Sequence, residues 1–304
     1  MSFAGDLKNE LCLIEPADGN SAFAECYGIA ITARSFDANA VALVTASLSG
    51  AERYAALAER VCGVSLTLSS RAKSGGANLY TVSAADPDRA RILSLFGYTG
   101  TEPVRRLRLD NLSREDTLSD FIRGAYLSCG SISDPNKSYH LELALPYLNL
   151  SREIAAMLGG LLCEPKQVRR RGDYLLYYKE SENIEDFLTF IGAPMRALEI
   201  MEIKVVKDVR NQVNRRTNCE TANIDKTVAA SSRQVADIEL IRERRGLEYL
   251  PENLRELAYL RLENPELSLS ELGRALSDPI SRSGVNHRLE RISRIAAELR
   301  AKQG

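Results

Sequence analysis

The sequence lacks the usual signs of a metal site, a disulfide framework or a membrane anchor. Its 304 residues include two histidines and six scattered cysteines, with no Cys-x-x-Cys pair. This pattern argues against zinc binding and against a disulfide-stapled fold. The sequence has no N-terminal apolar segment typical of a signal peptide and no run of about 18 apolar residues, so we expect neither export nor membrane insertion. We therefore expect a cytoplasmic protein with free thiols, no metal and no cofactor.

Charge is nearly balanced over the whole chain but unevenly distributed. The net charge is -1, from 40 basic and 41 acidic residues, which excludes general polyanion binding by the whole molecule. Residues 205–304 carry 18 basic and 15 acidic side chains, and residues 1–204 carry 22 and 26. Within the tail, residues 280–304 hold six basic and two acidic side chains. Positive charge is thus concentrated where a phosphate-binding surface would place it.

One order of elements occurs twice within residues 1–204. The first copy is predicted as a helix at 22–33, a strand-rich run at 40–47, a helix at 51–61, strands at 64–70 and 77–84, and a helix at 87–96. The second copy is predicted as a helix at 118–129, a strand at 139–145, a helix at 151–162, strands on both sides of 171–173, and a helix at 184–190. Gly28 and Gly124 are 96 positions apart, and the hairpin glycines Gly75 and Gly172 are 97 apart. A near-constant offset through five elements indicates an internal duplication.

The duplication predicts an α+β domain built from two similar halves. Each half would supply about four antiparallel strands, with helices over one face of the sheet and the other face open and concave. The two glycine-containing helices would pack against each other at a pseudo-twofold axis. Small side chains would allow the two helix backbones to approach closely; they are Gly28, Ala30 and Ala33 on one helix and Gly124, Ala125 and Ser128 on the other.

Residues 205–234 are predicted to form a polar linker between this domain and a helical domain over residues 235–304. The segment is rich in asparagine and basic residues and poor in large apolar ones. Its basic run has two interpretations, a solvated helix face or an arm that contacts phosphates between two DNA-binding parts.

The helical domain contains the pattern of a helix-turn-helix. Ser268 is followed three residues later by Glu271, the spacing of a capping box that begins a short helix. Residues 277–279 break that helix, and Ser281 begins a second one in which Val285 and two later apolar residues point inward. Arginine and asparagine on such a helix can bond base edges in the major groove, while serine hydroxyls and the helix N-terminus attract phosphates. The candidate DNA-binding residues are Ser268, Ser281, Arg282, Ser283, Asn286, His287, Arg288, Arg291 and Arg294.

Neither histidine is predicted to bind metal. His287 fits a base or phosphate contact and a structural hydrogen bond equally well. His140 lies in a predicted strand, and no second histidine is available to join it in a metal site.

Residues 25–34 and 121–130 both resemble the LAGLIDADG helix of homing endonucleases. In those enzymes a carboxylate just before the final glycine binds the catalytic metal. The equivalent positions here hold Ala33 and Cys129. Alanine offers no ligand and a thiol suits soft metals, whereas magnesium needs hard oxygen ligands. The resemblance therefore implies the scaffold of a nuclease with degenerate metal positions.

Longer motifs resemble the WhiA family of bacterial regulators. They are SFAGDLKNEL at 2–11, FIRGAYLSCGSISDPNKSYHLEL at 121–143, VNRRTNCETANIDKTVAAS at 213–231 and LSLSELGRALSDPISRSGVNHRLERI at 267–292. The resemblance implies a degenerate LAGLIDADG domain of αββαββα type, followed by an all-α helix-turn-helix domain similar to sigma-factor region 4. It also implies binding to double-stranded promoter DNA, with RNA polymerase or another regulator as a candidate partner, and a role at the nucleoid in cell division, chromosome segregation and, in spore formers, sporulation.

Three hypotheses about the function remain open. The favoured one is a transcription regulator that reads DNA without cutting it. A residual nuclease would need acids, and the nearby Asp37 and Asp134 are explained by turns. The third reading places only the tail on DNA, while the open sheet binds a protein or a small ligand. Basic clusters near the predicted strands could contact DNA, although solvent-facing charge is the favoured interpretation; they are Arg105, Arg106, Arg108, Lys166 and Arg169 to Arg171.

Overall fold

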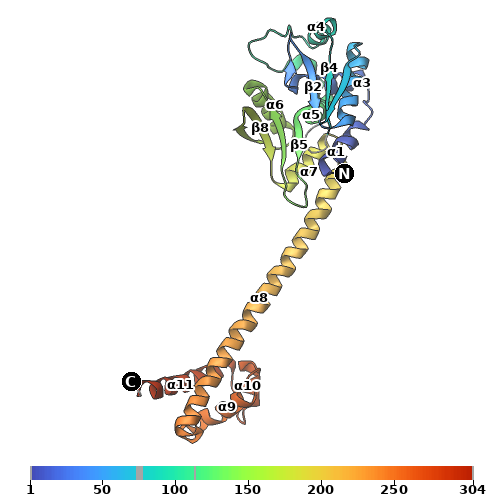
Figure 1. The fold of residues 1–304 in the computed structure, drawn as a ribbon. Coiled ribbons are helices and arrows are strands. Elements are labelled where there is room, and N and C mark those ends of the chain that lie inside the picture. The colour runs from blue at the N-terminus through green and yellow to red at the C-terminus, as the bar shows by residue number, and fades with distance from the viewer. Residues whose placement is uncertain (1, 73–77, 113, 303–304) are drawn as a thin grey trace. The chain divides into compact units, whose positions relative to one another are not determined.

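The computed structural model describes residues 2–72, 78–112 and 114–302 (Figure 1). The chain divides into two compact units, residues 1–207 and residues 208–304. Each unit has its own cluster of buried apolar side chains. No helix in the described ranges is both long and apolar enough to cross a lipid bilayer.

The first unit contains the duplicated element order that the sequence predicts. After α1 (Phe3–Cys12), the first copy comprises α2 (Gly19–Thr32), β1 (Ser35–Phe36), β2 (Val41–Thr45), α3 (Leu48–Cys62), β3 (Thr67–Ala72), β4 (Asn78–Ser83) and α4 (Asp86–Leu95). The second copy comprises α5 (Leu118–Cys129), β5 (Gly130–Ile132), β6 (Leu141–Leu145), α6 (Leu148–Leu161), β7 (Lys166–Arg170), β8 (Asp173–Tyr178) and α7 (Ser181–Phe190). The α+β prediction is confirmed.

Each copy forms a four-stranded antiparallel sheet with the same strand order. The orders are β1-β2-β4-β3 and β5-β6-β8-β7. Alternate residues of β2 and β6 are buried, so each sheet has one face on the core and one open face. The second hairpin turns at Arg171 and Gly172, which have φ of 53° and 93°. The first hairpin, predicted at Gly75 and Gly76, lies outside the described residues.

Helices α2 and α5 pack at the centre of this unit, backbone against backbone. A Cβ atom at Gly28 would lie 2.2 Å from the carbonyl oxygen of Phe121, and one at Gly124 would lie 2.1 Å from that of Glu25. These distances are far below van der Waals contact, so only glycine fits at either position. The predicted close approach of the two helices is confirmed.

Residues 205–234, predicted as a polar linker, are helical and belong to α8 (Pro194–Arg245). Residues 235–245, the start of the predicted helical domain, are the last part of the same element. The physical reason lies in the breakers: no proline or glycine occurs between Pro194 and Gly246. Pro194 occupies the first position of the helix, where a missing N–H is tolerated, and Gly246 ends it with a φ of 76°. Polarity here indicated exposure to solvent and not loss of the helix.

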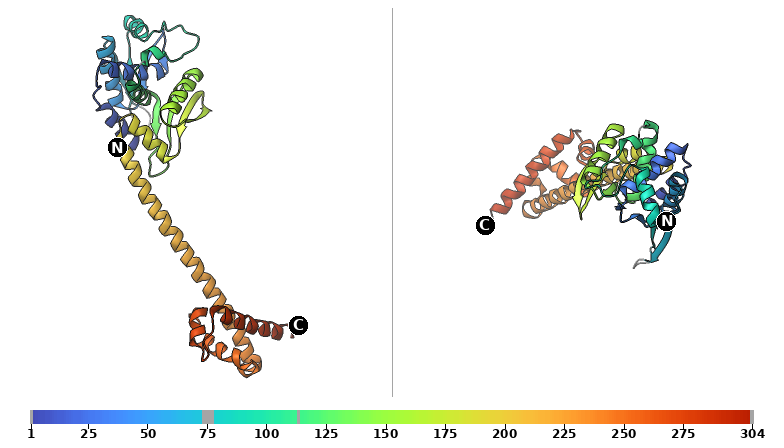
Figure 2. Two further views of the ribbon diagram at one scale, coloured as in Figure 1. Left: turned by 180° about the vertical axis from the view of Figure 1, so that it is seen from behind. Right: turned by 90° about the horizontal axis from the view of Figure 1, so that it is seen from above.

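The second unit consists of helices around a small apolar core. Figure 2 shows α9 (Glu252–Glu263), α10 (Leu269–Ala275) and α11 (Arg282–Ala301) gathered around the C-terminal end of α8. Ile238 and Ile241 of α8 belong to the same core as Leu254, Leu272 and Leu289. The C-terminal part of α8 is therefore an integral helix of this unit.

Candidate nucleic-acid interface

The helix α10 begins with the capping box that the sequence predicts. The Ser268 hydroxyl accepts a hydrogen bond from the Glu271 N–H at 3.3 Å, and the Glu271 carboxylate accepts one from the Ser268 N–H at 2.9 Å. Two N–H groups at the helix start are thereby satisfied, which fixes where this short helix begins.

The turn between α10 and α11 is held close to α10 by a glycine. A Cβ atom at Gly273 would lie 2.4 Å from the Ile280 carbonyl oxygen, and the Ile280 N–H donates to the Gly273 carbonyl at 3.0 Å. The Glu256 carboxylate of α9 accepts from the backbone N–H of Ser277 at 2.6 Å. These contacts set the position of α11 relative to α10 and α9.

Helix α11 has one buried face, as predicted from its spacing. Ser281 caps its start by accepting from the Gly284 N–H at 3.3 Å. Val285, Leu289 and Ile292 are each no more than 2% exposed. Residues spaced i, i+4 and i+7 share one helix face, so the remaining positions are presented to solvent.

The candidate DNA-binding residues lie where the sequence placed them on the helix. Arg282, Ser283, Asn286, His287, Arg291 and Arg294 are exposed. Ser281, Arg282, Ser283 and Asn286 line one open hollow of about 540 Å³ together with Leu269. His287, Arg291 and Arg294 follow an i, i+4, i+7 spacing and therefore form a second stripe.

Arg288 and Asn286 have partners within the unit. Arg288 is half-buried, and its Nη1 donates to the Asn253 carbonyl at 3.2 Å. This contact ties α11 to α9 and reduces the freedom of Arg288 to reach DNA. The Asn286 amide donates to Glu290 at 2.8 Å across one turn. An exposed bond of this kind exchanges readily for a bond to a base edge.

Ala33 and Cys129, at the ends of α2 and α5, occupy the positions where the related endonucleases carry metal-binding acids. This former metal corner contains neutral or cationic groups. The Cys129 thiol donates to the Ala125 carbonyl at 3.2 Å, and burial raises the pKa of Cys129 to about 12. Lys8 lies nearby and donates to the Leu127 carbonyl at 3.1 Å, and burial lowers the pKa of Lys8. A neutral thiol is a poor ligand for magnesium.

Arg105 occupies this corner and is not a solvent-facing charge. Its side chain is buried, with Nη1 donating to the Ala33 carbonyl at 2.8 Å and Nη2 to the Phe36 carbonyl at 2.6 Å. The guanidinium carbon lies 4.1 Å from the centre of the Tyr147 ring. The prediction of a solvent-facing basic cluster is therefore wrong for Arg105, because the Ala33 carbonyl at the end of α2 and the Phe36 carbonyl of β1 bind its guanidinium. The other members of the clusters are exposed; they are Arg106, Arg108, Lys166, Arg169, Arg170 and Arg171.

The aspartates near this corner are engaged in turns. Asp37 accepts from the Asn39 N–H at 2.8 Å, and Asp134 accepts from the Asn136 N–H at 2.9 Å. The backbone bond from Asn136 holds the pKa of Asp134 below its usual value. Across the described residues, no group of three or more His, Cys, Asp or Glu side chains is placed to hold a metal ion.

Two sequence models of one family match most of the second half of the chain. The WhiA LAGLIDADG-like domain matches residues 118–210, and the WhiA C-terminal HTH domain matches residues 213–296. The chain belongs to the WhiA family. Its first unit is accordingly a LAGLIDADG-like domain, and its second unit contains the family's helix-turn-helix.

Similar proteins carry the same family name. The chain is 46% identical to a "Probable cell division protein WhiA" of Clostridium novyi over 66% of its own length and 62% of that protein. It is 49% identical to one of Clostridium perfringens over 61% of its length and 59% of that protein. The aligned regions thus span about three fifths of these WhiA relatives. The crystal structure of full-length WhiA from Thermotoga maritima aligns with 98% of the chain and 99% of that protein, with a TM-score of 0.60 and 27% identity.

Four residues near α11 that could meet a ligand were missed by the sequence analysis. Lys226, Ser231 and Gln234 of α8 and Arg261 of α9 line a cavity that also includes Arg282 and Asn286. Lys226, Ser231 and Gln234 lay in the predicted linker, and Arg261 lay in the predicted helical domain outside the helix-turn-helix. Only the packing of α8 against the helix-turn-helix brings them to this surface, and no local pattern indicates it.

Proposed function

We propose that this chain is a sequence-specific DNA-binding regulator that acts through α11 and does not cleave DNA. Family membership supports a role in cell division. The proposal extends this role to chromosome segregation and, in spore formers, to sporulation. The proposed partners are promoter DNA and RNA polymerase or another regulator. The proposed location is the nucleoid in the cytoplasm.

The observation that carries the proposal is the two-sided character of α11. Its inner face is fixed by buried aliphatic side chains, and its outer face presents arginine, asparagine and serine from the first turn onward. Recognition helices contact base edges through residues near their N-termini. Near the start of α11, Asn286 can form paired bonds to adenine and Arg282 to guanine.

The deciding experiment measures binding of Asn286→Ala to a selected site and to random DNA by fluorescence anisotropy. We expect specific binding to weaken by about 1–3 kcal/mol and nonspecific binding to stay unchanged, because a base contact is lost. Asn218→Ala removes an exposed amide on α8, outside α11, and serves as the matched control. Equal losses on both DNAs would show that Asn286 contacts only phosphate or sugar.

A second role is supported for the LAGLIDADG-like unit, in which its open sheet face binds a protein or a small ligand. A cavity of about 430 Å³ lies at the former metal corner, lined by Ala42, Val44, Cys129 and Ala144 among others. Arg34 is its charged lining residue, and its Nη2 donates to both carboxylate oxygens of Asp173, at 2.7 and 2.9 Å. A largely apolar lining with a neutralised arginine fits an apolar group better than a phosphate.

A further inference from the structure

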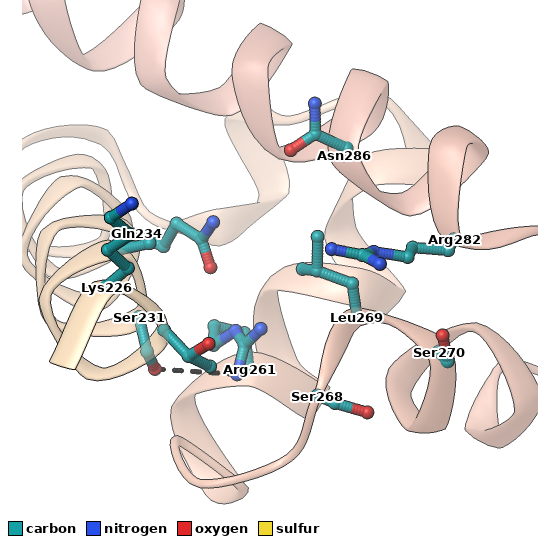
Figure 3. Close-up of a pocket in the computed structure, with 11 residues that line it drawn as sticks. Lys226, Ser231, Gln234, Arg261, Ser268, Leu269, Ser270, Arg282 and Asn286 are labelled. Atoms are coloured by element: carbon teal, nitrogen blue, oxygen red, sulfur yellow. Dashed lines mark hydrogen bonds between the residues drawn. The ribbon is translucent and has the colours of Figure 1, made fainter. Parts of the chain in front are cut away.

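A cavity of about 410 Å³ lies within the second unit, beside the start of α11. Ser231 and Gln234 of α8 line it on one side, and Arg282 and Asn286 of α11 line it on the other (Figure 3). Arg261 lies between them in the same view. This volume falls in the range of small-molecule sites in proteins.

Arg261 is a buried cation whose hydrogen bonds within the described residues go to carbonyl and hydroxyl oxygens. Its side chain is 2% exposed, and its Nη1 donates to the Leu267 carbonyl at 2.8 Å and the Pro265 carbonyl at 3.2 Å. Among the residues that the structure describes, no carboxylate forms an ion pair with it, and its Nε is buried without a hydrogen-bond partner. Burial lowers the pKa of Arg261. Burying a guanidinium without an ion-pair partner lowers the stability of the fold, and an anion in the cavity would offset that loss.

The other lining groups add positive charge and one orphan acceptor. Lys226 and Arg282 also line the cavity, and none of its lining residues in the described chain is acidic. The Gln234 Oε1 is buried and, within the described residues, accepts no hydrogen bond. The cavity therefore favours a ligand that is anionic, accepts from Arg261 and donates to Gln234. Hydrogen phosphate meets all three requirements because it keeps a P–O–H group, whereas sulfate at neutral pH has no such donor.

We propose that this cavity is a phosphate-binding site, filled by a free phosphate-bearing small molecule or by a phosphate of the DNA backbone. Of these, inorganic hydrogen phosphate fits the donor requirement of Gln234, because a phosphodiester and a fully ionised phosphomonoester have no P–O–H group. Because Arg282 and Asn286 belong to both the cavity and the proposed DNA-reading face, the bound phosphate sits where it can alter DNA affinity. The DNA source rests on the proposed function; the free-phosphate source does not.

The first arm of the test uses inorganic phosphate on the full chain. We expect sodium phosphate to raise the Tm above that in sodium chloride or sodium sulfate of equal ionic strength, since a ligand of the folded state stabilises it. Lys226→Ala and Gln234→Leu should each raise the phosphate dissociation constant by about tenfold, as expected for one lost charge-assisted or buried hydrogen bond. Arg233→Ala removes an exposed charge on the same helix outside the cavity and should change nothing.

The second arm measures DNA affinity of the same variants as a function of salt. If the phosphate is that of DNA, inorganic phosphate leaves the Tm unchanged, and Lys226→Ala lowers the slope of log K against log salt by about 1 while Arg233→Ala does not. The proposal is overturned if phosphate has no specific effect and Lys226→Ala behaves as Arg233→Ala on DNA. If the unmutated chain does not bind DNA, the proposed function is overturned, whereas the first arm still tests binding of free phosphate.

Discussion

Ala33 and Cys129 show at the residue scale how a metal corner is rebuilt without metal. Two nearby carboxylates repel each other when no cation lies between them. Here a methyl group and a neutral thiol remove that repulsion, and the Arg105 guanidinium binds the Ala33 carbonyl directly.

We expect the chain to leave supercoiled plasmid intact in Mg²⁺ or Mn²⁺, because hard-metal ligands are missing at both helix ends. Cys129→Asp alone should not create activity, since Ala33 still offers no carboxylate and Arg105 remains bound at that corner. Agarose gels of plasmid incubated with and without a chelator provide the measurement. Metal-dependent linearisation that disappears in Asp134→Ala would contradict this prediction.

Glu25 illustrates a second residue-scale feature, a buried ion cluster. It is fully buried and accepts from Arg53 at 2.8 Å and from Arg123 at 3.2 Å, and Arg123 also pairs with Asp120. The cluster joins α2, α3 and α5, so it sets the relative placement of three helices. Its stability value depends on every member being present.

Glu25→Ala should lower the free energy of unfolding by about 3–5 kcal/mol, because Arg53 would lose its carboxylate and Arg123 would keep only that of Asp120. Urea denaturation followed by circular dichroism measures the change. Asp116→Ala breaks the exposed pair with Arg114 and should leave the unfolding midpoint unchanged. Similar losses for both variants would show that the buried cluster has no special weight.

At the scale of elements, the α2–α5 pair organises the LAGLIDADG-like unit. Each copy of the duplication contributes one helix, and each helix has a glycine against the backbone of the other. Direct backbone contact leaves no room for repacking of side chains, in contrast to an ordinary core in which neighbours can shift. The two halves therefore fit closely at this pair of glycines.

Gly28→Ala should lower the free energy of unfolding by about 1–3 kcal/mol or more, as overpacking does. The added Cβ would meet the Phe121 carbonyl at 2.2 Å, and backbone atoms cannot rotate away. Gly160→Ala on α6 is the control, since its Cβ would meet nothing within 4 Å. Alanine there should be neutral or stabilising by up to about 1 kcal/mol. A neutral Gly28→Ala in the same denaturation assay would refute the close contact.

At the scale of the whole molecule, two units with separate apolar cores share the single helix α8. Both units carry exposed arginines, on β7 in one and on α11 in the other. The two sets differ in setting. Arg169 lies over the Tyr174 ring at 5.6 Å on an exposed edge strand, whereas Arg291 and Arg294 follow the N-terminal turn of a capped helix.

Matched charge reversals should separate the two surfaces. We expect Arg291→Glu with Arg294→Glu to weaken DNA binding steeply and to lower the salt slope by about 2, one for each lost phosphate contact. Arg169→Glu with Arg170→Glu makes the same change in net charge and should leave affinity and slope nearly unchanged. Equal effects of the two pairs in anisotropy titrations at several salt concentrations would place the sheet on DNA as well.

The accuracy of the sequence predictions varied with how local their causes are. The bounds predicted for α5 match Leu118–Cys129, because Gly130 ends its pattern, and the Ser268 capping box is confirmed. The polar linker predicted at 205–234 lies within α8, because no proline or glycine interrupts the helix there; its low hydrophobicity indicated exposure and left its secondary structure open. Local chemistry sets helix ends, so it can be read directly from the sequence.

The duplication, the absence of both metal-binding acids and the inward and outward faces of α11 follow from the amino-acid sequence alone. These depend on residue identity and on spacing along one element. The burial of Arg105 and Arg261, two arginines that composition places on the surface, depends on tertiary packing. A long cationic side chain is buried when unpaired carbonyls from distant segments meet within its reach. That meeting is produced by packing, and it turns two ordinary basic residues into a structural clasp and the centre of a proposed phosphate site.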